Sequence, residues 1–154
     1  MTTRLRVLLV DPSLFSAPYD RALAAALVQQ GIDVEVLARP LRQGERSFAG
    51  EPFRFTPRCY RLAEGAAARL PERLRLPLKA FEHLLALTAL ERRLRRHPVD
   101  VVHWLWLALP VLDGWVLRRL RRRIAVVLTV HDREPFQGAA VSRLQRRGRE
   151  SWKA

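Results

Sequence analysis

Polar and aromatic side chains follow several apolar runs of this sequence, and their types suit binding or catalysis. A histidine exchanges a proton near neutral pH, carboxylates and hydroxyls hydrogen-bond polar ligands, and indole rings stack on apolar ring faces. The candidate catalytic residue is His131, which follows the apolar run at 124–130. The candidate substrate-binding residues come just after an apolar run or at the start of the next helix: Asp11, Ser13, Tyr19, His103, Trp104 and Asp132.

The acidic candidates also have structural interpretations. Asp11 and Ser13 belong to an Asp-Pro-Ser sequence that is typical of turns. Asp132 suits a cap of the following turn, and capping is favoured for it. Asp20 is interpreted first as the cap of the first helix and second as a ligand-binding residue.

The histidine and tryptophan candidates have alternatives of the same kind. His103 and His131 fit a ligand pocket, and they equally fit strand ends at which neighbours satisfy the imidazole. Trp104 and Trp106 fit ring stacking on a ligand, but a core position is favoured for them. Cys59 has no histidine or carboxylate beside it, so a nucleophilic role is not expected.

Five short segments are predicted to be strands, because each is apolar or alternates apolar with polar residues. They lie at 6–10, 34–37, 53–55, 99–102 and 124–130. Helices are predicted over 18–30, 78–96 and 107–120, and the rest of 40–77 is expected to be loop and broken helix because glycines and prolines interrupt it. The predicted apolar face of the helix at 78–96 consists of Phe81, Leu84, Leu85, Leu87, Leu90 and Leu94.

Strands and helices alternate along the chain, which predicts a Rossmann-like, three-layer α/β domain with a mostly parallel sheet of about five strands. The first 40 residues form one β-α-β unit, whose crossover should be right-handed. Ligands of such sheets bind beyond the carboxyl ends of the strands. The topology is therefore expected to bring together the residues at 11–13, 38–39, 103–104 and 131–132.

The chain of 154 residues has a formal net charge of +13, and nearly all of its positive side chains are arginines. Such a charge alone suggests nucleic-acid binding. No helix-turn-helix pattern and no basic strand with interleaved aromatics accompanies it, so a basic nucleic-acid-binding module is the less favoured alternative. The arginines at 92–96 and 118–123 suit solvated helix ends, or contacts with the phosphates of an anionic membrane.

Several functional classes lack their motifs here. The sequence has no Cys/His spacing for a metal and no Walker loop, GxSxG or GxGxxG, so neither a metal nor a bound cofactor is expected. A single cysteine cannot form an internal disulfide. Because neither a signal peptide nor a transmembrane run is visible, we expect a cytoplasmic protein, with peripheral contact at the inner face of the membrane as the alternative.

Three segments, taken in order, carry a resemblance to a known family. They are RVLLVDPSLFSAPYDRALAAALVQQGIDVEVLARP at the start, DVVHWLWLALP at 100–110 and VVLTVHD at 126–132. Residues 4–138 resemble the N-terminal domain of subfamily 4-like glycosyltransferases of the GT-B fold. In that family a D-[VI]-[VI]-H strand precedes, by one helix, a [VI]-x-T-x-H-[DE] strand.

The resemblance implies an enzyme with two facing Rossmann-like domains, of which residues 1–138 form the acceptor-side one. The intact enzyme would transfer a hexose from a nucleotide-sugar, its co-substrate, to a sugar or lipid-linked acceptor, without a bound metal. His131 would hydrogen-bond the donor sugar or orient the reacting groups, and His103 would line the acceptor pocket.

Two departures from the family pattern bear on function. The loop DPSLFSAPYD lacks the glycine-rich turn that many relatives have after the first strand. The E-x7-E donor motif belongs to a C-terminal donor-binding domain, which this chain is expected to lack, and 139–154 is expected to be a basic, disordered tail. The chain is therefore expected to be inactive alone, or to be the non-catalytic acceptor-binding subunit of a split enzyme whose donor-binding chain is separate.

Overall fold

The structure is a computed structural model that describes residues 4–130. His131, Asp132 and the tail at 139–154 lie outside the described residues.

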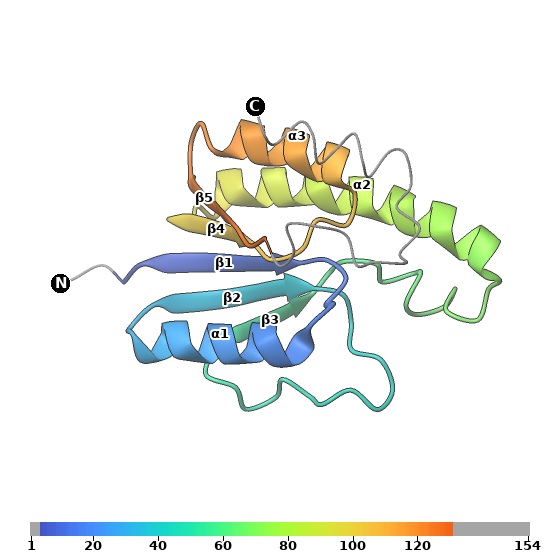
Figure 1. Cartoon of the computed structure of the whole chain (residues 1–154), viewed down its shortest axis with the longest axis horizontal. Coiled ribbons are helices and arrows are strands. Elements are labelled where there is room, and N and C mark those ends of the chain that lie inside the picture. Colours follow the sequence, from blue (N-terminus) through green and yellow to red (C-terminus); the bar gives the residue numbers. More distant parts are fainter. Residues whose placement is uncertain (1–3, 131–154) are drawn as a thin grey trace.

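Five parallel strands form the central sheet (Figure 1). They are β1 (Arg6–Asp11), β2 (Asp33–Ala38), β3 (Arg54–Pro57), β4 (Val101–Trp104) and β5 (Ala125–Leu128). Their order in the sheet is β3-β2-β1-β4-β5, and every neighbouring pair is parallel. The predicted Rossmann-like α/β architecture is confirmed.

Helices cover both faces of this sheet (Figure 1). Helix α1 (Ala17–Gln29) lies on one face, and α2 (Glu72–Arg96) and α3 (Pro110–Leu120) lie together on the other. Side chains of β1 alternate between the two layers. Val7 and Leu9 pack in the core on the α1 side, and Leu8 and Val10 pack in the core on the side of α2 and α3. This burial on both faces explains why β1 is continuously apolar.

Helix α2 begins at Glu72, and the prediction that the helix starts at position 78 was wrong. Pro77 lies inside it. Pro77 cannot donate an N–H to the carbonyl of Arg73, and the helix continues through it without that hydrogen bond. Helix α3 begins at Pro110, a position at which the fixed φ of proline favours helix entry.

The predicted apolar face of α2 was also partly wrong. The buried residues of the helix are His83, Leu87, Leu90 and Leu94. Phe81, Leu84 and Leu85 are 59%, 46% and 52% exposed. The first half of α2 extends beyond the carboxyl ends of the strands (Figure 1), so the sheet does not cover these side chains. No helix in the described part of the chain is long and apolar enough to cross a bilayer.

Candidate functional site

Asp11 ends β1 and orders the loop that follows it. Its side chain is fully buried, and its two oxygens accept the backbone N–H groups of Ser13 at 3.1 Å and Phe15 at 2.7 Å. Leu14, between them, has a φ of +46°, which residues other than glycine rarely adopt. The structure thus shows Asp11 in its turn role, with its carboxylate directed at the loop backbone.

Asp20 is buried in the first turn of α1 and is not the helix cap, contrary to the sequence interpretation. The N-cap is Ser16. Burial, and next the nearby Asp11 carboxylate, raise the pKa of Asp20 to about 8. As a carboxylate, Asp20 would have no hydrogen-bond donor. As a carboxylic acid it donates its O–H to Asp11, so the two buried groups share one negative charge at neutral pH.

Arg39 ties the loop after β2 to the loop after β1. Its residue is only 2% exposed, and its Nε donates to the carbonyl of Ser13 at 2.8 Å. Its two Nη atoms bind the two oxygens of Glu45 at 2.8 and 2.6 Å. This fork, the most favourable geometry for an arginine and a carboxylate, lowers the pKa of Glu45 to about 2. Arg39 therefore holds Ser13 in place.

A buried chain of hydrogen bonds joins Tyr60 to the helices α2 and α3. The Tyr60 hydroxyl lies 2.7 Å from Nδ1 of His83, and Nε2 of His83 lies 2.5 Å from Oδ1 of Asp113. The other Asp113 oxygen accepts the N–H of Leu109 at 2.8 Å. In the tautomer that satisfies both neighbours, Nε2–H donates to Asp113 and Nδ1 accepts the Tyr60 O–H.

Sequence reasoning missed Tyr60, His83 and Asp113 as a group. One signal for it was present, because His83 has helical spacing with the buried leucines of α2. A polar side chain on a buried stripe requires a hydrogen-bond partner. The partners are 23 and 30 residues away along the chain, and no local pattern identifies them.

His103 is half-buried in β4, close to its carboxyl end. Its Nε2 lies 2.7 Å from the hydroxyl of Thr129, the residue that follows β5. Burial lowers the pKa of His103, so its imidazole is neutral at neutral pH. His103 is opposite Val127 in the register of β4 and β5, so the carboxyl ends of these two strands lie side by side. The residues at 131–132, which were expected to meet His103, lie outside the described residues.

The aromatic side chains at these strand ends have different environments. Trp104 is fully buried in the core against α2 and α3, as the favoured interpretation had it. The ring of Trp106 packs against Phe15, with centroids 4.4 Å apart, and Phe15 is 71% exposed. Tyr19, in the first turn of α1, is 41% exposed. An open aromatic surface therefore lies beside the loop after β1.

We call the residues at this end of the sheet the carboxyl-end surface. It consists of Ser13, Phe15, Tyr19, His103, Trp106 and Thr129. The surface combines hydrogen-bonding side chains with the exposed rings of Phe15 and Tyr19. Residues 4–130 contain no group of three or more histidine, cysteine or acidic side chains placed to hold a metal ion.

One family of known proteins matches this chain, and a solved structure has a similar fold. The family model of Glycosyltransferase Family 4 matches residues 19–154. No curated protein sequence matches the chain. Among solved structures, MurG of Acinetobacter baumannii superposes with a TM-score of 0.54 at 20% identity, over 80% of this chain and 34% of MurG.

Two further structures show weaker similarity. Os79 of O. sativa, solved in complex with UDP, has a TM-score of 0.48 at 18% identity, over 80% of this chain and 28% of Os79. A sucrose-phosphate synthase of Thermosynechococcus elongatus has a TM-score of 0.42 at 19% identity, over 83% of this chain and 64% of that structure. The chain thus spans about a third of MurG, and at such identity the similarity shows the fold alone.

Proposed function

The chain belongs to Glycosyltransferase Family 4, and from this premise we propose that it forms the N-terminal, acceptor-side half of a glycosyltransferase. In this proposal residues 1–138 are the acceptor-side domain, and a second Rossmann-like domain binds the donor. The complete enzyme transfers a hexose from a nucleotide-sugar to a sugar or lipid-linked acceptor. The chain alone does not catalyse transfer, because donor and acceptor must be held together in one cleft.

The observation that carries this proposal is the meeting of polar and aromatic groups on the carboxyl-end surface. The 2.7 Å contact between His103 and Thr129 joins the ends of β4 and β5. Ligands of parallel α/β sheets bind beyond these strand ends. Ser13 and Tyr19 are proposed to contact the acceptor together with His103, and Asp11 to position their loop.

His131 and Asp132 remain part of the proposal through their place in the sequence. They follow Thr129, which the structure describes, by two and three residues. His131 is proposed as the residue that meets the donor sugar, and Asp132 as an acceptor contact or turn cap.

Binding measurements with the full chain test this proposal. We expect sugar or polyprenyl-phosphate acceptors to bind, and Ser13→Ala with His103→Gln to weaken binding about tenfold through lost hydrogen bonds. Gln30→Ala, an exposed polar residue after α1, is the matched control and should change nothing. Turnover of UDP-glucose or GDP-mannose by the chain alone, or donor binding without acceptor binding, would contradict the proposal.

A split enzyme is the second candidate, and the sheet edge favours it. Within residues 4–130 β5 is an outer strand, and Val127 and Val130 beside this edge are 44% and 66% exposed. Exposed apolar groups at an edge suit pairing with another segment or chain. Co-purification of a donor-binding chain would support this candidate, and failure to find any stable partner would count against it.

The exposed half of α2 supports peripheral contact with an anionic membrane. Leu74, Phe81 and Leu85 lie on one side of the helix by spacing and are 55%, 59% and 52% exposed. Arg69 precedes the helix and Arg73 lies in its first turn, and both are exposed. An apolar stripe beside arginines is the pattern of a helix that lies in a membrane interface. Such contact would bring the carboxyl-end surface close to a lipid-linked acceptor.

Sedimentation with vesicles tests this contact. We expect binding to phosphatidylglycerol vesicles and about tenfold less binding for Phe81→Ser with Leu85→Ser, because two apolar side chains no longer leave water. Leu5→Ser, which removes a residue of similar exposure at the start of the chain, is the control. Equal binding of all three proteins would show that α2 is not the membrane contact.

A further inference from the structure

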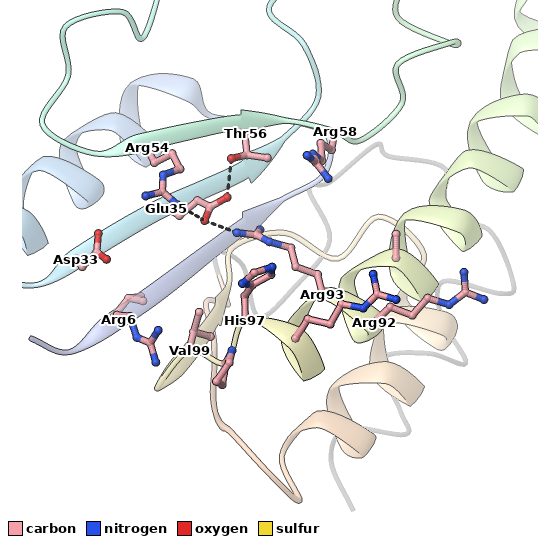
Figure 2. A pocket seen from close by; sticks show the side chains of 14 residues that line it. Arg6, Asp33, Glu35, Arg54, Thr56, Arg58, Arg92, Arg93, His97 and Val99 are labelled. Carbon is pink, nitrogen blue, oxygen red and sulfur yellow. Dashed lines mark hydrogen bonds and ion pairs between the residues drawn. The ribbon is translucent and has the colours of Figure 1, made fainter. Parts of the chain in front are cut away.

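A second site lies away from the carboxyl-end surface, between the last turns of α2 and the sheet (Figure 2). It is an open groove of about 710 Å³. The residues that define it, called the arginine groove below, are Arg6, Arg54, Arg58, Arg92, Arg93 and Arg96. They come from β1, β3 and its following loop, and α2. Three separate parts of the chain thus contribute positive side chains to the lining of one hollow.

The groove forms because one face of the sheet changes from apolar to charged along β2. Leu37 packs in the core against α2 and α3. Glu35, two residues earlier and therefore on the same face, lines the groove instead. Leu87, Leu90 and Leu94 pack in the core. The arginines near the end of α2 lie on other sides of the helix and line the groove.

One carboxylate organises part of the groove. Glu35 accepts a hydrogen bond from the Thr56 hydroxyl at 2.5 Å, forms an ion pair with Arg93, and lies 3.8 Å from Arg54. Figure 2 shows the Arg93 side chain extended across the groove to Glu35. Glu35 is thereby shared between two guanidinium groups, and it leaves the remaining arginines uncompensated.

The other four arginines have no side-chain hydrogen bond or ion pair within residues 4–130. They are Arg6, Arg58, Arg92 and Arg96. The Nη1 atom of Arg93 is also buried without a hydrogen-bond partner. Asp33 is the only further acidic residue that lines the groove within the described chain. Like charges gathered in this way repel one another unless an anion joins them.

The arginines of the groove indicate which chemical groups a ligand there would carry. Guanidinium groups bind phosphate oxygens through two parallel N–H donors, and two or three of them saturate one phosphate. Six guanidinium groups along one groove exceed that requirement. A volume of about 710 Å³ is in the range of sites for small molecules, roughly 300–1,000 Å³.

We propose that the arginine groove binds a ligand that carries two or more linked phosphate groups, held chiefly by Arg58, Arg92 and Arg96. The ligand is either a soluble di- or triphosphate or a phosphorylated lipid headgroup, since both present the same chemistry. The proposal does not depend on glycosyl transfer, because its residues lie outside the carboxyl-end surface.

Calorimetry with the full chain and inorganic pyrophosphate, at about 0.15 M salt to screen weak surface attraction, provides the test. We expect saturable binding, at least about tenfold weaker binding of monophosphate, and at least a tenfold loss for Arg58→Gln with Arg92→Gln. Arg121→Gln with Arg122→Gln removes the same charge from exposed residues after α3 and should stay within about twofold of the wild type. Arg58 and Arg92 are exposed, so their replacement should leave the melting temperature unchanged.

Vesicles that contain a pyrophosphate-bearing lipid separate the two sources. Binding of soluble pyrophosphate that depends on the groove arginines assigns a soluble ligand. Binding only to those vesicles, with the same dependence, assigns a lipid headgroup. The proposal would be overturned if both double variants lost binding of pyrophosphate equally. It would also be overturned if no binding depended on Arg58 and Arg92. Stronger binding of an oligonucleotide, weakened equally by both variants, would overturn it as well.

Discussion

His83 on α2 and Asp113 on α3 are joined side chain to side chain at 2.5 Å, with 1% and 0% of their side chains exposed. This contact links the two helices that cover one face of the sheet. Because Tyr60 binds the other imidazole nitrogen, the same link reaches the loop that leads away from β3. A buried polar group of this kind stabilises a fold only while every member has its partner.

Loss of the Asp113 carboxylate should therefore be costly. Asp113→Ala leaves the Nε2–H of His83 and the N–H of Leu109 buried without an acceptor, and we expect the free energy of unfolding to fall by about 2–4 kcal/mol. Asp113→Asn should cost less, because its amide oxygen still accepts one bond. Urea unfolding measures both. The exposed Glu72→Ala is the control, and an equally small effect of Asp113→Ala would show that the link does not stabilise the domain.

Asp20 should make stability depend on pH. Its folded pKa of about 8 lies above the ordinary value, so the folded protein keeps a proton that the unfolded chain has released. The stabilisation is complete below about pH 4 and is lost as the pH rises through 8. Urea unfolding at pH 5, 7 and 9 should show a falling free energy of unfolding for the wild type.

Asp20→Asn provides the comparison, because its amide still donates to Asp11 but does not titrate. The fall between pH 5 and 9 should be smaller in this variant. Asp33→Asn, which removes an exposed carboxylate, should keep the slope of the wild type. If the free energy of unfolding of Asp20→Asn fell with pH as much as that of the wild type, a group other than Asp20 would cause the dependence.

Two bidentate arginine–glutamate pairs should differ in energy because the burial of their arginines differs. Arg39 binds Glu45 with a side chain that is 3% exposed, whereas Arg42 binds Glu64 with a side chain that is 53% exposed. Arg39→Lys loses the fork and the bond to Ser13, and we expect a cost of about 1–3 kcal/mol in urea unfolding. Arg42→Lys should cost less than about 1 kcal/mol. Similar costs would show that burial of Arg39 adds nothing.

Cys59 should be unreactive in the folded protein. Its residue is 2% exposed, and burial raises the pKa of its thiol to about 12, so very little of the reactive thiolate exists at pH 8. Iodoacetamide labelling followed by mass spectrometry should be slow in buffer and fast in about 6 M urea, which unfolds most small domains. Rapid labelling of the folded chain would show that the loop around Cys59 opens.

His103 should titrate below the ordinary histidine range. Burial lowers its pKa, so the folded state disfavours the charged imidazole, and this contribution to stability is lost as the pH falls. Proton NMR should show the His103 ring signal moving at a lower pH than in the urea-unfolded chain. His103→Gln identifies the signal by its disappearance. If the His103 signal moved at the same pH in the folded and the unfolded chain, the imidazole would be open to water.

The order of strands and helices was predictable because its signals are local. The apolar run that forms β1 and the alternation of elements each involve neighbouring residues. The approach of His103 to the end of β5 followed from parallel topology alone. The prediction of buried residues failed where the fold offers no surface to pack against. Phe81 and Leu85 have regular helical spacing, but the sheet does not reach them.

The sequence by itself determined the fold class, the alternation of strands and helices along the chain, and the strand ends at which a site could form, since propensity and periodicity act over a few residues. Only the tertiary structure decided which polar groups meet. The buried chain from Tyr60 through His83 to Asp113, the fork of Arg39, and the arginine groove beside Glu35 join residues from different elements. Their contacts depend on where α2 crosses the sheet, and that crossing is set by the packing of the whole core rather than by any one segment.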